Sequence, residues 1–333
     1  MLLIDWDSPI SMVAYVAVGI AAFVTLYKYY LHLTSGKIPS SRNIEGKTIL
    51  ITGANAGIGK ETARDLAKRG ARIIMACRNM ETAKQARAEI TAESGNSNLI
   101  VKHVDLSSLS SVRQFAQDIN ATETVIDVLI HNAGVSQGFD NRVTADGLDL
   151  TLATNCYGPF LLTHLLIDLL KKSDQGRIIF VSSKLYQFTY VRKDLSNINP
   201  IDYFSLFPVE LYNLSKHIEI MFTQELARRL EGTRITANCL HPGVIDTGIW
   251  RNIPFPVNLL FKPIQMMLRT PEQGIRTTVY LTVSPEVENI SGKYFRWCQL
   301  AKLNQRVQNK DIQQRLWEAS KALVKLTDND PKI

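Results

Sequence analysis

The chain has 333 residues, of which 45% are hydrophobic, 21% charged and 8% aromatic. This composition indicates a globular protein with a large core, and it excludes a disordered, collagen-like or disulfide-stapled chain. The 38 lysines and arginines exceed the 31 aspartates and glutamates, for a net charge of +7, but they form no long basic run. We therefore expect an anionic small ligand or an anionic membrane surface as partner, and no nucleic acid.

The chain begins with a candidate membrane segment. Residues 9–27 carry no charge and are mostly Val, Ala, Ile, Leu, Phe and Tyr, close to the ~20 residues that cross a bilayer as a helix. Asp5 and Asp7 precede this segment, which argues against a cleaved signal peptide or a mitochondrial transit peptide. We expect residues 1–33 to form an uncleaved membrane anchor. A helix lying in one leaflet is the alternative.

The basic residues around this segment all follow it, and they are Lys28, Lys37, Arg42 and Lys47. By the positive-inside rule, the rest of the chain lies on the cytosolic side. The four cysteines agree with this location, because they lie far apart and match no metal-ligand spacing. We expect reduced thiols and no metal site.

Residues 34–44 are rich in Ser, Gly, Pro and Lys and predict a linker. From residue 45 to residue 333 we expect one domain, in which short apolar runs alternate with helical patterns. The predicted strands cover residues 47–52, 72–76, 100–104, 127–130, 177–181 and 235–240. The predicted helices cover residues 60–69, 81–94, 110–120, 150–172 and 212–230. This alternation predicts an α/β fold with a parallel sheet covered by helices on both faces.

The first strand and the first helix are joined by a glycine-rich loop, TGANAGIG, at residues 52–59. A first glycine permits the turn, and two later ones allow a close backbone approach, so the loop is typical of a dinucleotide pyrophosphate site. The alternative is an ordinary tight turn. The loop residues that we expect to bind the cofactor are Gly53, Asn55, Gly57, Ile58 and Gly59.

In folds that bind a dinucleotide at such a loop, the residues at the end of the second strand select for or against a 2′-phosphate on the ribose. The residues there are Ala-Cys-Arg, with no carboxylate to bind ribose hydroxyls, and Arg78 could bind a 2′-phosphate. We therefore predict NADP(H), with an arginine on a solvated loop as the alternative. Asp105 and Leu106 close the third strand, where they could contact the adenine. The alternative for this pair is a helix N-cap with the two serines that follow.

A candidate acid–base pair lies at Tyr212 and Lys216, which are four residues apart and share a helix face. An adjacent ammonium stabilises the phenolate, so Tyr212 could act as a general acid or base. The alternative is a surface pair. Ser183 ends the fifth strand, where it could hydrogen-bond a substrate oxygen, or form part of an ordinary turn. Asn155 lies inside an apolar helix, which is unfavourable unless its side chain bonds something.

Together these motifs resemble a short-chain dehydrogenase/reductase over about residues 45–300. The shared motifs are the TGxxxGxG loop, the NAG tripeptide, the serine and YxxxK. The resemblance implies a Rossmann-type doubly wound parallel sheet and a general acid/base at Tyr212. It further implies that Lys216 binds the nicotinamide ribose and tunes Tyr212, that Ser183 orients the substrate oxygen, and that Asn155 holds a relay water.

The resemblance also implies further cofactor contacts, at Asn132, Ala133, Gly134, Pro242, Gly243 and Thr247. His131 replaces a commoner asparagine, a change that we expect to matter little. The ACR after the second strand, the long segment between Ser183 and Tyr212, and SGKYF at 291–295 are similar to membrane-bound retinol dehydrogenases. This similarity implies an NADP(H)-dependent enzyme of retinoids and other lipid alcohols, at the endoplasmic reticulum membrane or a lipid droplet.

Several alternatives stay open. A polyprenol or dolichol-pathway dehydrogenase and a steroid or fatty-aldehyde reductase resemble the chain as well. A nucleotide-binding scaffold without turnover and a sugar-nucleotide epimerase are the rivals outside this chemistry. The apolar segment 249–268 suits either a lipophilic substrate or core packing. The C-terminal segment has an apolar stripe at helical spacing, made of Ile312, Leu316, Leu323 and Val324. We expect this stripe to pack on the core, with membrane contact as the alternative. A homo-oligomer is possible from the sequence, which leaves the oligomeric state open.

Overall fold

A computed structural model describes residues 9–38, 43–137, 142–201, 209–245 and 268–333. Its centre is one sheet of eight strands in the order β3-β2-β1-β4-β5-β6-β7-β8. The first seven strands pair in parallel, and β8 is antiparallel to β7. The strands are β1 (Thr48–Thr52), β2 (Arg72–Cys77), β3 (Leu99–His103), β4 (Val128–His131), β5 (Gly176–Val181), β6 (Ile235–His241), β7 (Tyr294–Arg296) and β8 (Gln299–Leu300). The predicted parallel sheet is confirmed.

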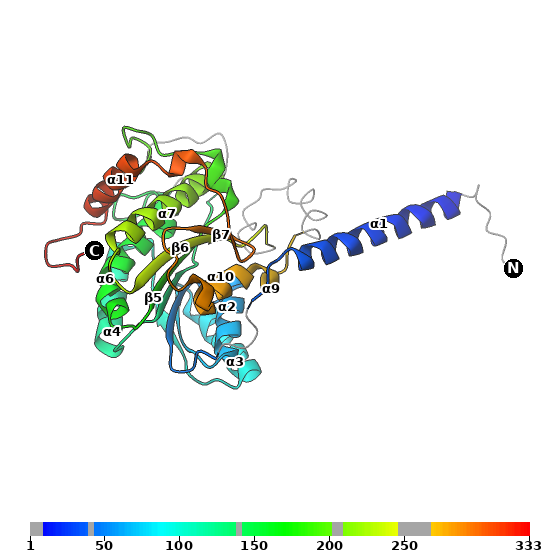
Figure 1. Ribbon diagram of the computed structural model, residues 1–333, viewed down its shortest axis with the longest axis horizontal. Coiled ribbons are helices and arrows are strands. Elements are labelled where there is room, and N and C mark those ends of the chain that lie inside the picture. Colours follow the sequence, from blue (N-terminus) through cyan, green and yellow to red (C-terminus); the bar gives the residue numbers. More distant parts are fainter. Residues whose placement is uncertain (1–8, 39–42, 138–141, 202–208, 246–267) are drawn as a thin grey trace.

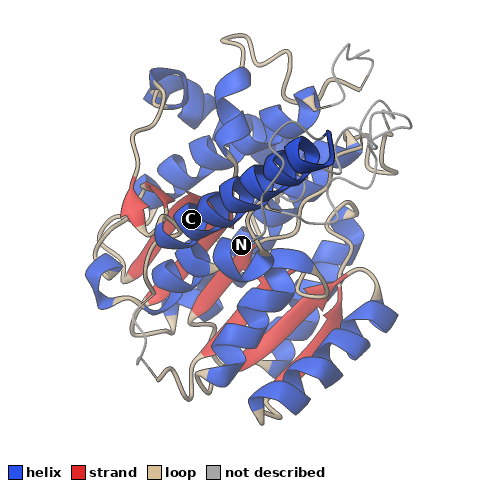
Figure 2. Cartoon of the chain, turned by 90° about the vertical axis from the view of Figure 1, so that its right-hand side faces the viewer, coloured by secondary structure: helices blue, strands red, loops and turns tan. Residues whose placement is uncertain are grey.

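Helices cover both faces of the sheet (Figure 2). The long helices are α1 (Pro9–Leu33), α2 (Gly57–Lys68), α3 (Met80–Ser94), α4 (Leu109–Thr122), α6 (Gly158–Lys171), α7 (Glu210–Arg229) and α11 (Lys310–Leu323). The shorter ones are α5 (Leu150–Leu152), the π-helical turn η1 (Ala153–Tyr157), α9 (Pro271–Gly274), α10 (Arg276–Val283), and the 3₁₀ turns η2 (Lys184–Phe188), η4 (Pro285–Val287) and η5 (Gln305–Val307). The predicted helix 150–172 is thus one continuous helix, Leu150–Lys171, with a π-helical turn inside it.

Side chains alternate between the two faces of each strand, and both faces are buried. In β1, Leu50 joins the core under α4, α6 and α7, whereas Ile49 and Ile51 join the core under α2, α3 and α10. All three side chains are fully buried. A strand buried on both faces reads as a continuous apolar run, which explains why these strands show no polar alternation in the sequence.

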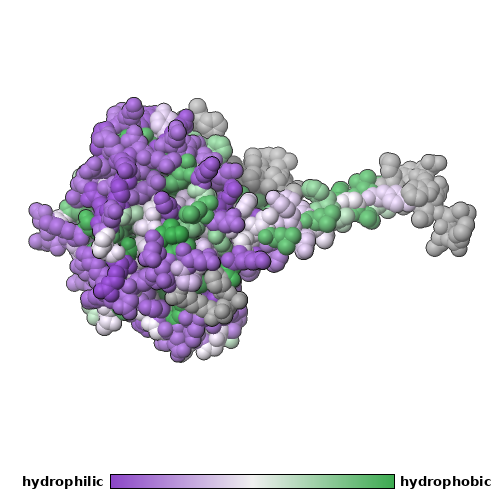
Figure 3. Space-filling view, viewed as in Figure 1, coloured by the Kyte–Doolittle hydropathy of each residue, from purple (hydrophilic) through white to green (hydrophobic). Residues whose placement is uncertain are grey.

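Helix α1 projects away from the sheet (Figure 1) and exposes apolar side chains where the rest of the visible surface is largely hydrophilic (Figure 3). Among the described residues, two helical segments are long and apolar enough to cross a membrane: Val13–Leu33, with none of its most apolar window buried, and Leu150–Lys171, with 83% buried. The second is therefore a core helix of the body, and the first is the candidate span.

The carboxyl end of α1 is held against the body by two arginines. The Arg269 guanidinium donates to the Leu31 carbonyl at 2.7 Å and to the Thr34 hydroxyl at 3.0 Å. Arg276 donates to the carbonyl of Gly36 at 3.1 Å. Cations are favourable at this end of a helix, where the last carbonyls have no partner within the helix. These contacts join two parts of the chain that are more than 230 residues apart.

The C-terminal helix α11 packs on α6 and α7. Trp317 is buried, with its ring centre 4.7 Å from that of Phe160 and 6.2 Å from that of Phe222. Ile312, Leu316 and Val324 are buried in the same core, and Leu323 packs against it. Core packing of this stripe is confirmed, and membrane contact by these four side chains is wrong.

Candidate active site

The candidate site lies at the carboxyl edge of the sheet, where the parallel strands end. β1 leads into the glycine-rich loop, β4 ends at His131, and β5 is followed directly by Ser182 and Ser183. Helix α7 passes this edge beside β5, as the bond from Lys216 Nζ to the Val181 carbonyl at 3.0 Å shows. The fold therefore brings together residues that are up to about 160 positions apart in the sequence.

The glycine-rich loop has the geometry that the sequence predicts. Gly53 and Gly57 adopt positive φ angles of 67° and 53°, which a side chain would strain. A Cβ on Gly59 would lie 2.3 Å from the Gly53 carbonyl oxygen and 2.4 Å from Asn132 Nδ2, so only glycine fits there. The N-cap of α2 is Ala56, which gives no side-chain hydrogen bond. The first N–H groups of α2 therefore have no side-chain acceptor, which fits an external anion such as a pyrophosphate.

Two further contacts fix this loop. The Gly53 N–H donates to the Ala76 carbonyl at 2.8 Å, which ties the loop to the end of β2. Asn55 Nδ2 donates to the Thr82 hydroxyl on α3 at 2.9 Å. Ile58 points toward α9, since a Cβ on Gly274 would lie 3.5 Å from its Cγ1. The loop is thus tied to the end of β2, to α3 and to α9.

The Asn-Ala-Gly segment after β4 lies against this loop through the buried Thr52. The Thr52 hydroxyl accepts hydrogen bonds from the N–H groups of Asn132 at 3.0 Å and Ala133 at 3.1 Å. A Cβ on Gly134 would lie 3.6 Å from Lys216 Nζ, so this glycine lies beside the lysine. His131 is buried, bonds the Thr163 hydroxyl at 2.8 Å and stacks on a core phenylalanine. Its contacts are with the core.

Arg78 and Asp105 follow the ends of β2 and β3. Arg78 is exposed at the end of β2, next to the loop, and could reach an anion there. One oxygen of Asp105 accepts from the Ser107 N–H at 2.9 Å and from the Ser107 hydroxyl at 2.6 Å. Leu106 is buried. Asp105 therefore has the local turn contact given by the alternative interpretation, and Ser108 caps α4.

Asn155 lies in the π-helical turn η1, a type of irregularity that is frequent at functional sites. Its Oδ1 accepts from the Val135 N–H at 2.8 Å, and its Nδ2 donates to the Val135 carbonyl at 3.0 Å. Nδ2 also donates to the Ser215 hydroxyl at 2.9 Å. Both donors of the buried amide are thus used, and the side chain connects the end of β4 with α7 one residue before Lys216.

Ser183, Tyr212 and Lys216 form the chemical centre. The Ser183 hydroxyl accepts from the Leu185 N–H at 3.2 Å and lies close enough to the Tyr212 phenol to lower its pKa. The Lys216 ammonium lies 5.4 Å from the centre of the Tyr212 ring. Burial raises the pKa of Tyr212, while the Lys216 ammonium and the Ser183 hydroxyl lower it. This arrangement can deliver a proton to, or take one from, a substrate oxygen beside Ser183.

Sequence reasoning missed Glu219, which forms a 2.7 Å ion pair with Lys216 inside the protein. The available signal was an acidic residue three positions after a lysine on a largely buried helix, because such residues face each other. It also predicted neither the role of the Thr52 hydroxyl nor the Arg269 contact with α1. The hydroxyl partners of Thr52 follow from tertiary structure, and the contact of Arg269 spans too much sequence for any local pattern.

The segment after β6 is described only in part. Pro242 and Gly243 follow this strand, and Gly243 has a φ of 104°. A Cβ on Gly243 would lie 2.8 Å from Arg269 Cδ, so the segment also lies beside the contact with α1. Thr247 and most of the apolar segment 249–268 lie outside the described residues.

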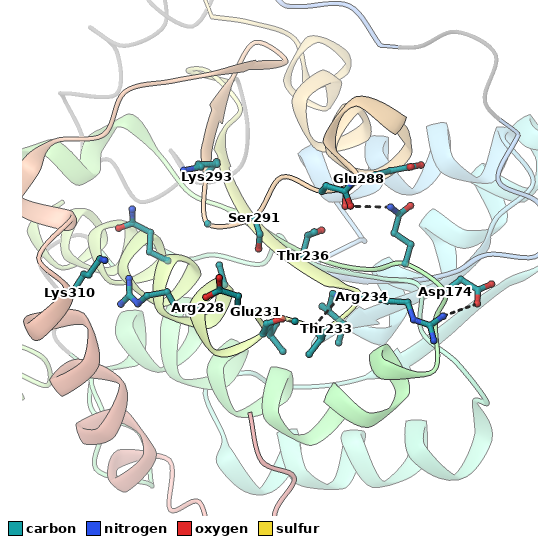
Figure 4. Close-up of a pocket in the computed structure, with 18 residues that line it drawn as sticks. Asp174, Arg228, Glu231, Thr233, Arg234, Thr236, Glu288, Ser291, Lys293 and Lys310 are labelled. Carbon is teal, nitrogen blue, oxygen red and sulfur yellow. Dashed lines mark hydrogen bonds and ion pairs between the residues drawn. The ribbon is translucent and has the colours of Figure 1, made fainter.

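A surface hollow of about 610 Å³ lies elsewhere, at the amino ends of β5 and β6 (Figure 4). Its walls mix both signs of charge, for example Arg234 with Asp174, and Lys293 with Glu288. None of the candidate site residues lines it. Ligands of open α/β sheets bind at the carboxyl edge, so we do not assign a function to this hollow.

Comparisons with known proteins agree with the motifs. A family model described as short chain dehydrogenase matches residues 47–193. The chain is 42% identical to human retinol dehydrogenase 14 over 301 residues, 85% of this chain and 88% of the relative. It is 38% identical to human retinol dehydrogenase 13 over 312 residues, 92% of each chain.

Among solved structures, a short chain dehydrogenase of Shigella flexneri complexed with NADP is 25% identical, with a TM-score of 0.59 over 76% of this chain and 98% of that one. Similarity of this extent to retinol dehydrogenases, together with the loop and the Ser183–Tyr212–Lys216 cluster, identifies the family. The chain belongs to the short-chain dehydrogenases/reductases: it is an oxidoreductase, resembling retinol dehydrogenases 11–14, with a fold that binds a nicotinamide dinucleotide.

Proposed function

We propose that the chain is an NADP(H)-dependent oxidoreductase that interconverts a lipid alcohol and its carbonyl, with retinol and retinal as the first candidates. The main support for the reaction is the position of Tyr212 near Ser183 and 5.4 Å from the Lys216 ammonium, at the carboxyl edge of the sheet. The support for the substrate is the 42% identity with a retinol dehydrogenase over most of both chains.

In the proposed reduction, Ser183 and Tyr212 bind the substrate carbonyl oxygen by hydrogen bonds. Tyr212 gives its phenolic proton to that oxygen as negative charge develops there, and Lys216 stabilises the resulting phenolate. In the oxidation, Tyr212 takes the proton back from the alcohol. When bound along the glycine-rich loop, NADP(H) supplies or accepts the hydride. Asn155 completes the proposed catalytic residues: it positions the end of β4 and holds the relay water.

The preference for NADP(H) is supported by the end of β2. Arg78 is exposed there, and the strand ends without a carboxylate that would repel a 2′-phosphate. A guanidinium binds phosphate through charge-assisted, often paired, hydrogen bonds. Asp105, Leu106, Asn132, Ala133, Gly134, Pro242, Gly243 and Thr247 complete the proposed cofactor site.

We further propose that α1 anchors the enzyme in the endoplasmic reticulum membrane or on a lipid droplet, with the catalytic domain facing the cytosol. The support is the exposed apolar surface of α1 and the basic residues after its charge-free part. The four free cysteines agree with a reducing compartment. A membrane location also suits a lipophilic substrate.

The test is NADPH oxidation by the detergent-solubilised full chain, with NADH in parallel. The substrates are all-trans-retinal, a polyprenal, a steroid ketone and a medium-chain aldehyde. Retinal should be reduced with NADPH, and much less with NADH. Faster reduction of another carbonyl would reassign the substrate, and cofactor binding without any turnover would favour a scaffold.

Tyr212→Phe removes only the phenolic oxygen. Because phenylalanine cannot give a proton to the substrate oxygen or take one from it, we expect turnover to fall by about 10²- to 10⁴-fold. NADPH binding should be retained. NADPH binding is measured by fluorescence titration. A variant that keeps wild-type turnover would refute the assignment of Tyr212.

A further inference from the structure

Glu219 places a second charge inside the candidate site. Its Oε1 lies 2.7 Å from Lys216 Nζ, one helical turn along α7, and both side chains are only 4% exposed. A surface pair of this kind would be weak because water and salt screen it. This pair is buried, so removing either partner leaves an uncompensated charge in the interior.

The pair fixes the direction of the Lys216 ammonium. One N–H is donated to Glu219, and a second to the Val181 carbonyl at the end of β5, at 3.0 Å. An ammonium has three donors, so one remains for a ligand. The Nζ atom lies 5.4 Å from the centre of the Tyr212 ring. Glu219 therefore helps to set where the positive charge lies relative to the phenol.

The two charges act on Tyr212 in opposite directions. Besides the effect of burial, which raises the pKa of Tyr212, the Lys216 ammonium lowers it and the Glu219 carboxylate raises it. Burial also raises the pKa of Glu219 to about 7, although Lys216 opposes this rise. The net charge beside Tyr212 thus depends on Glu219 as well as on Lys216.

The other groups around Glu219 stay neutral. The thiols of Cys156 on η1 and Cys239 on β6 both have pKa values raised above the usual value by burial. The Ser182 hydroxyl donates to the Lys216 carbonyl at 3.0 Å and lies close enough to Glu219 to lower the pKa of that carboxyl group. Within the described part of the chain, Lys216 and Tyr212 are therefore the groups whose charge responds to Glu219.

We propose that Glu219 is a positioning residue of this site: its carboxylate holds the Lys216 ammonium and offsets part of its charge, so that Tyr212 keeps its proton at neutral pH and donates it to a carbonyl. The inference rests on the proposed role of Tyr212. It adds a preference for reduction near neutral pH, which Lys216 alone would weaken.

The test is Glu219→Gln in the full-length detergent-solubilised chain. Glutamine keeps an oxygen that can accept from Lys216 and removes the negative charge. The rate of carbonyl reduction is measured against pH with saturating NADPH. The alkaline limb of kcat/KM, where Tyr212 loses its proton, should move to lower pH by about one unit.

Glu225→Gln is the matched control. Glu225 is also buried on α7 and pairs with Arg228 and Arg229, three and four residues on, away from Lys216. Its pH profile should match that of the wild type. An unchanged alkaline limb in Glu219→Gln, or the same shift in Glu225→Gln, would overturn the proposal.

Glu219→Asp and Glu219→Asn distinguish the loss of the charge from a folding defect. The aspartate keeps the charge and should keep the alkaline limb within a few tenths of a pH unit, whereas the asparagine should shift it as the glutamine does. If both neutral variants fail to bind NADPH while Glu219→Asp binds it, the carboxylate serves folding and the proposal is wrong. If Tyr212→Phe, with Glu219 unchanged, retains turnover, the proposed function fails, and that outcome is separate from any result on the Glu219 variants.

Discussion

At Gly59, a single added Cβ atom would be enough to disrupt the glycine-rich loop. An added Cβ would lie 2.3 Å from the Gly53 carbonyl oxygen, which is backbone and cannot move aside cheaply. We expect Gly59→Ala to lower stability by about 1–3 kcal/mol and to weaken NADPH binding strongly, because the loop must open. Thermal melting and fluorescence titration measure the two effects.

Gly95→Ala is the control for this prediction. Gly95 has a positive φ of 70° but open space around it, so alanine there costs about 1 kcal/mol through backbone strain alone. Cofactor binding should be unchanged. Equal losses of NADPH affinity in the two variants would mean that the glycine-rich loop has no special part in binding.

Arg78 is the residue on which cofactor choice should depend. Arg78→Ala removes a cation that would bind the 2′-phosphate, and a charged hydrogen bond of about 1.5–3 kcal/mol corresponds to a loss of about 10- to 150-fold in NADPH affinity. NADH affinity should change little. Arg87→Ala, an exposed change on α3, is the control. A similar loss for both cofactors in Arg78→Ala would contradict the assignment.

At the scale of elements, the contact between α1 and Arg269 joins parts of the chain that are 238 residues apart. Arg269 is buried, donates to Leu31 and Thr34, and lies 5.1 Å from the centre of the Trp297 ring. Arg269→Met keeps the apolar volume and leaves the helix carbonyl without a partner, at a cost of about 1–3 kcal/mol. We expect faster amide exchange and proteolysis near residues 31–36.

Arg234→Met provides the comparison for Arg269→Met, because Arg234 is largely exposed and its ion pair with Asp174 is 3.7 Å long. Exchange at residues 31–36 should not change in this control. Protection that stays at the wild-type level in Arg269→Met would mean that other contacts hold the end of α1.

The sequence predicts strongly periodic elements well and context-dependent ones poorly. Each of the six predicted strands lies within one residue of the observed strand, because a buried parallel strand is a short apolar run between breakers. The strands β7 and β8 were missed, since they have three and two residues and form only by pairing with β6 and with each other. The π-helical turn η1 has no separate sequence signal either.

The candidate site follows the same division. Gly53, Tyr212 and Lys216 were predicted because a loop motif and a helical spacing are local patterns. The ion pair of Lys216 with Glu219 was equally local, but its burial decides its meaning, and burial depends on how α7 packs on β5. The contact of Arg269 with α1 lay beyond any local pattern.

For the whole molecule, four buried histidines should set the response to acid. Burial lowers the pKa of His131 and His241 to about 3, and that of His164 and His217 to about 4. In the unfolded chain each pKa is about 6.5. Below that pH the unfolded state binds more protons than the folded state, so stability falls as pH falls, by up to about 1.4 kcal/mol per pH unit for each histidine.

Glu219 acts in the opposite sense between about pH 4.5 and 7, because its raised pKa lets the folded state bind the extra proton. Burial also raises the pKa of Asp149, which acts in the same sense as Glu219, but these two carboxyl groups do not offset four histidines. We therefore expect a net loss of stability from pH 7 to pH 5. Urea unfolding at several pH values measures it. His217→Gln should make the dependence shallower, and a stability that is flat over this interval would refute the prediction.

Because two arginines hold its carboxyl end, we expect α1 to fix the orientation of the catalytic body instead of acting as a loose tether. In a bilayer, the rotation of α1 about its own axis would then set the orientation of the candidate active site relative to the membrane surface. Each residue inserted into α1 would rotate the body by about 100° about the helix axis and raise it by about 1.5 Å, and a full turn would nearly restore the aim. Activity on a membrane-dissolved carbonyl should therefore vary with insertion length at the helical period, while activity on a water-soluble carbonyl stays constant.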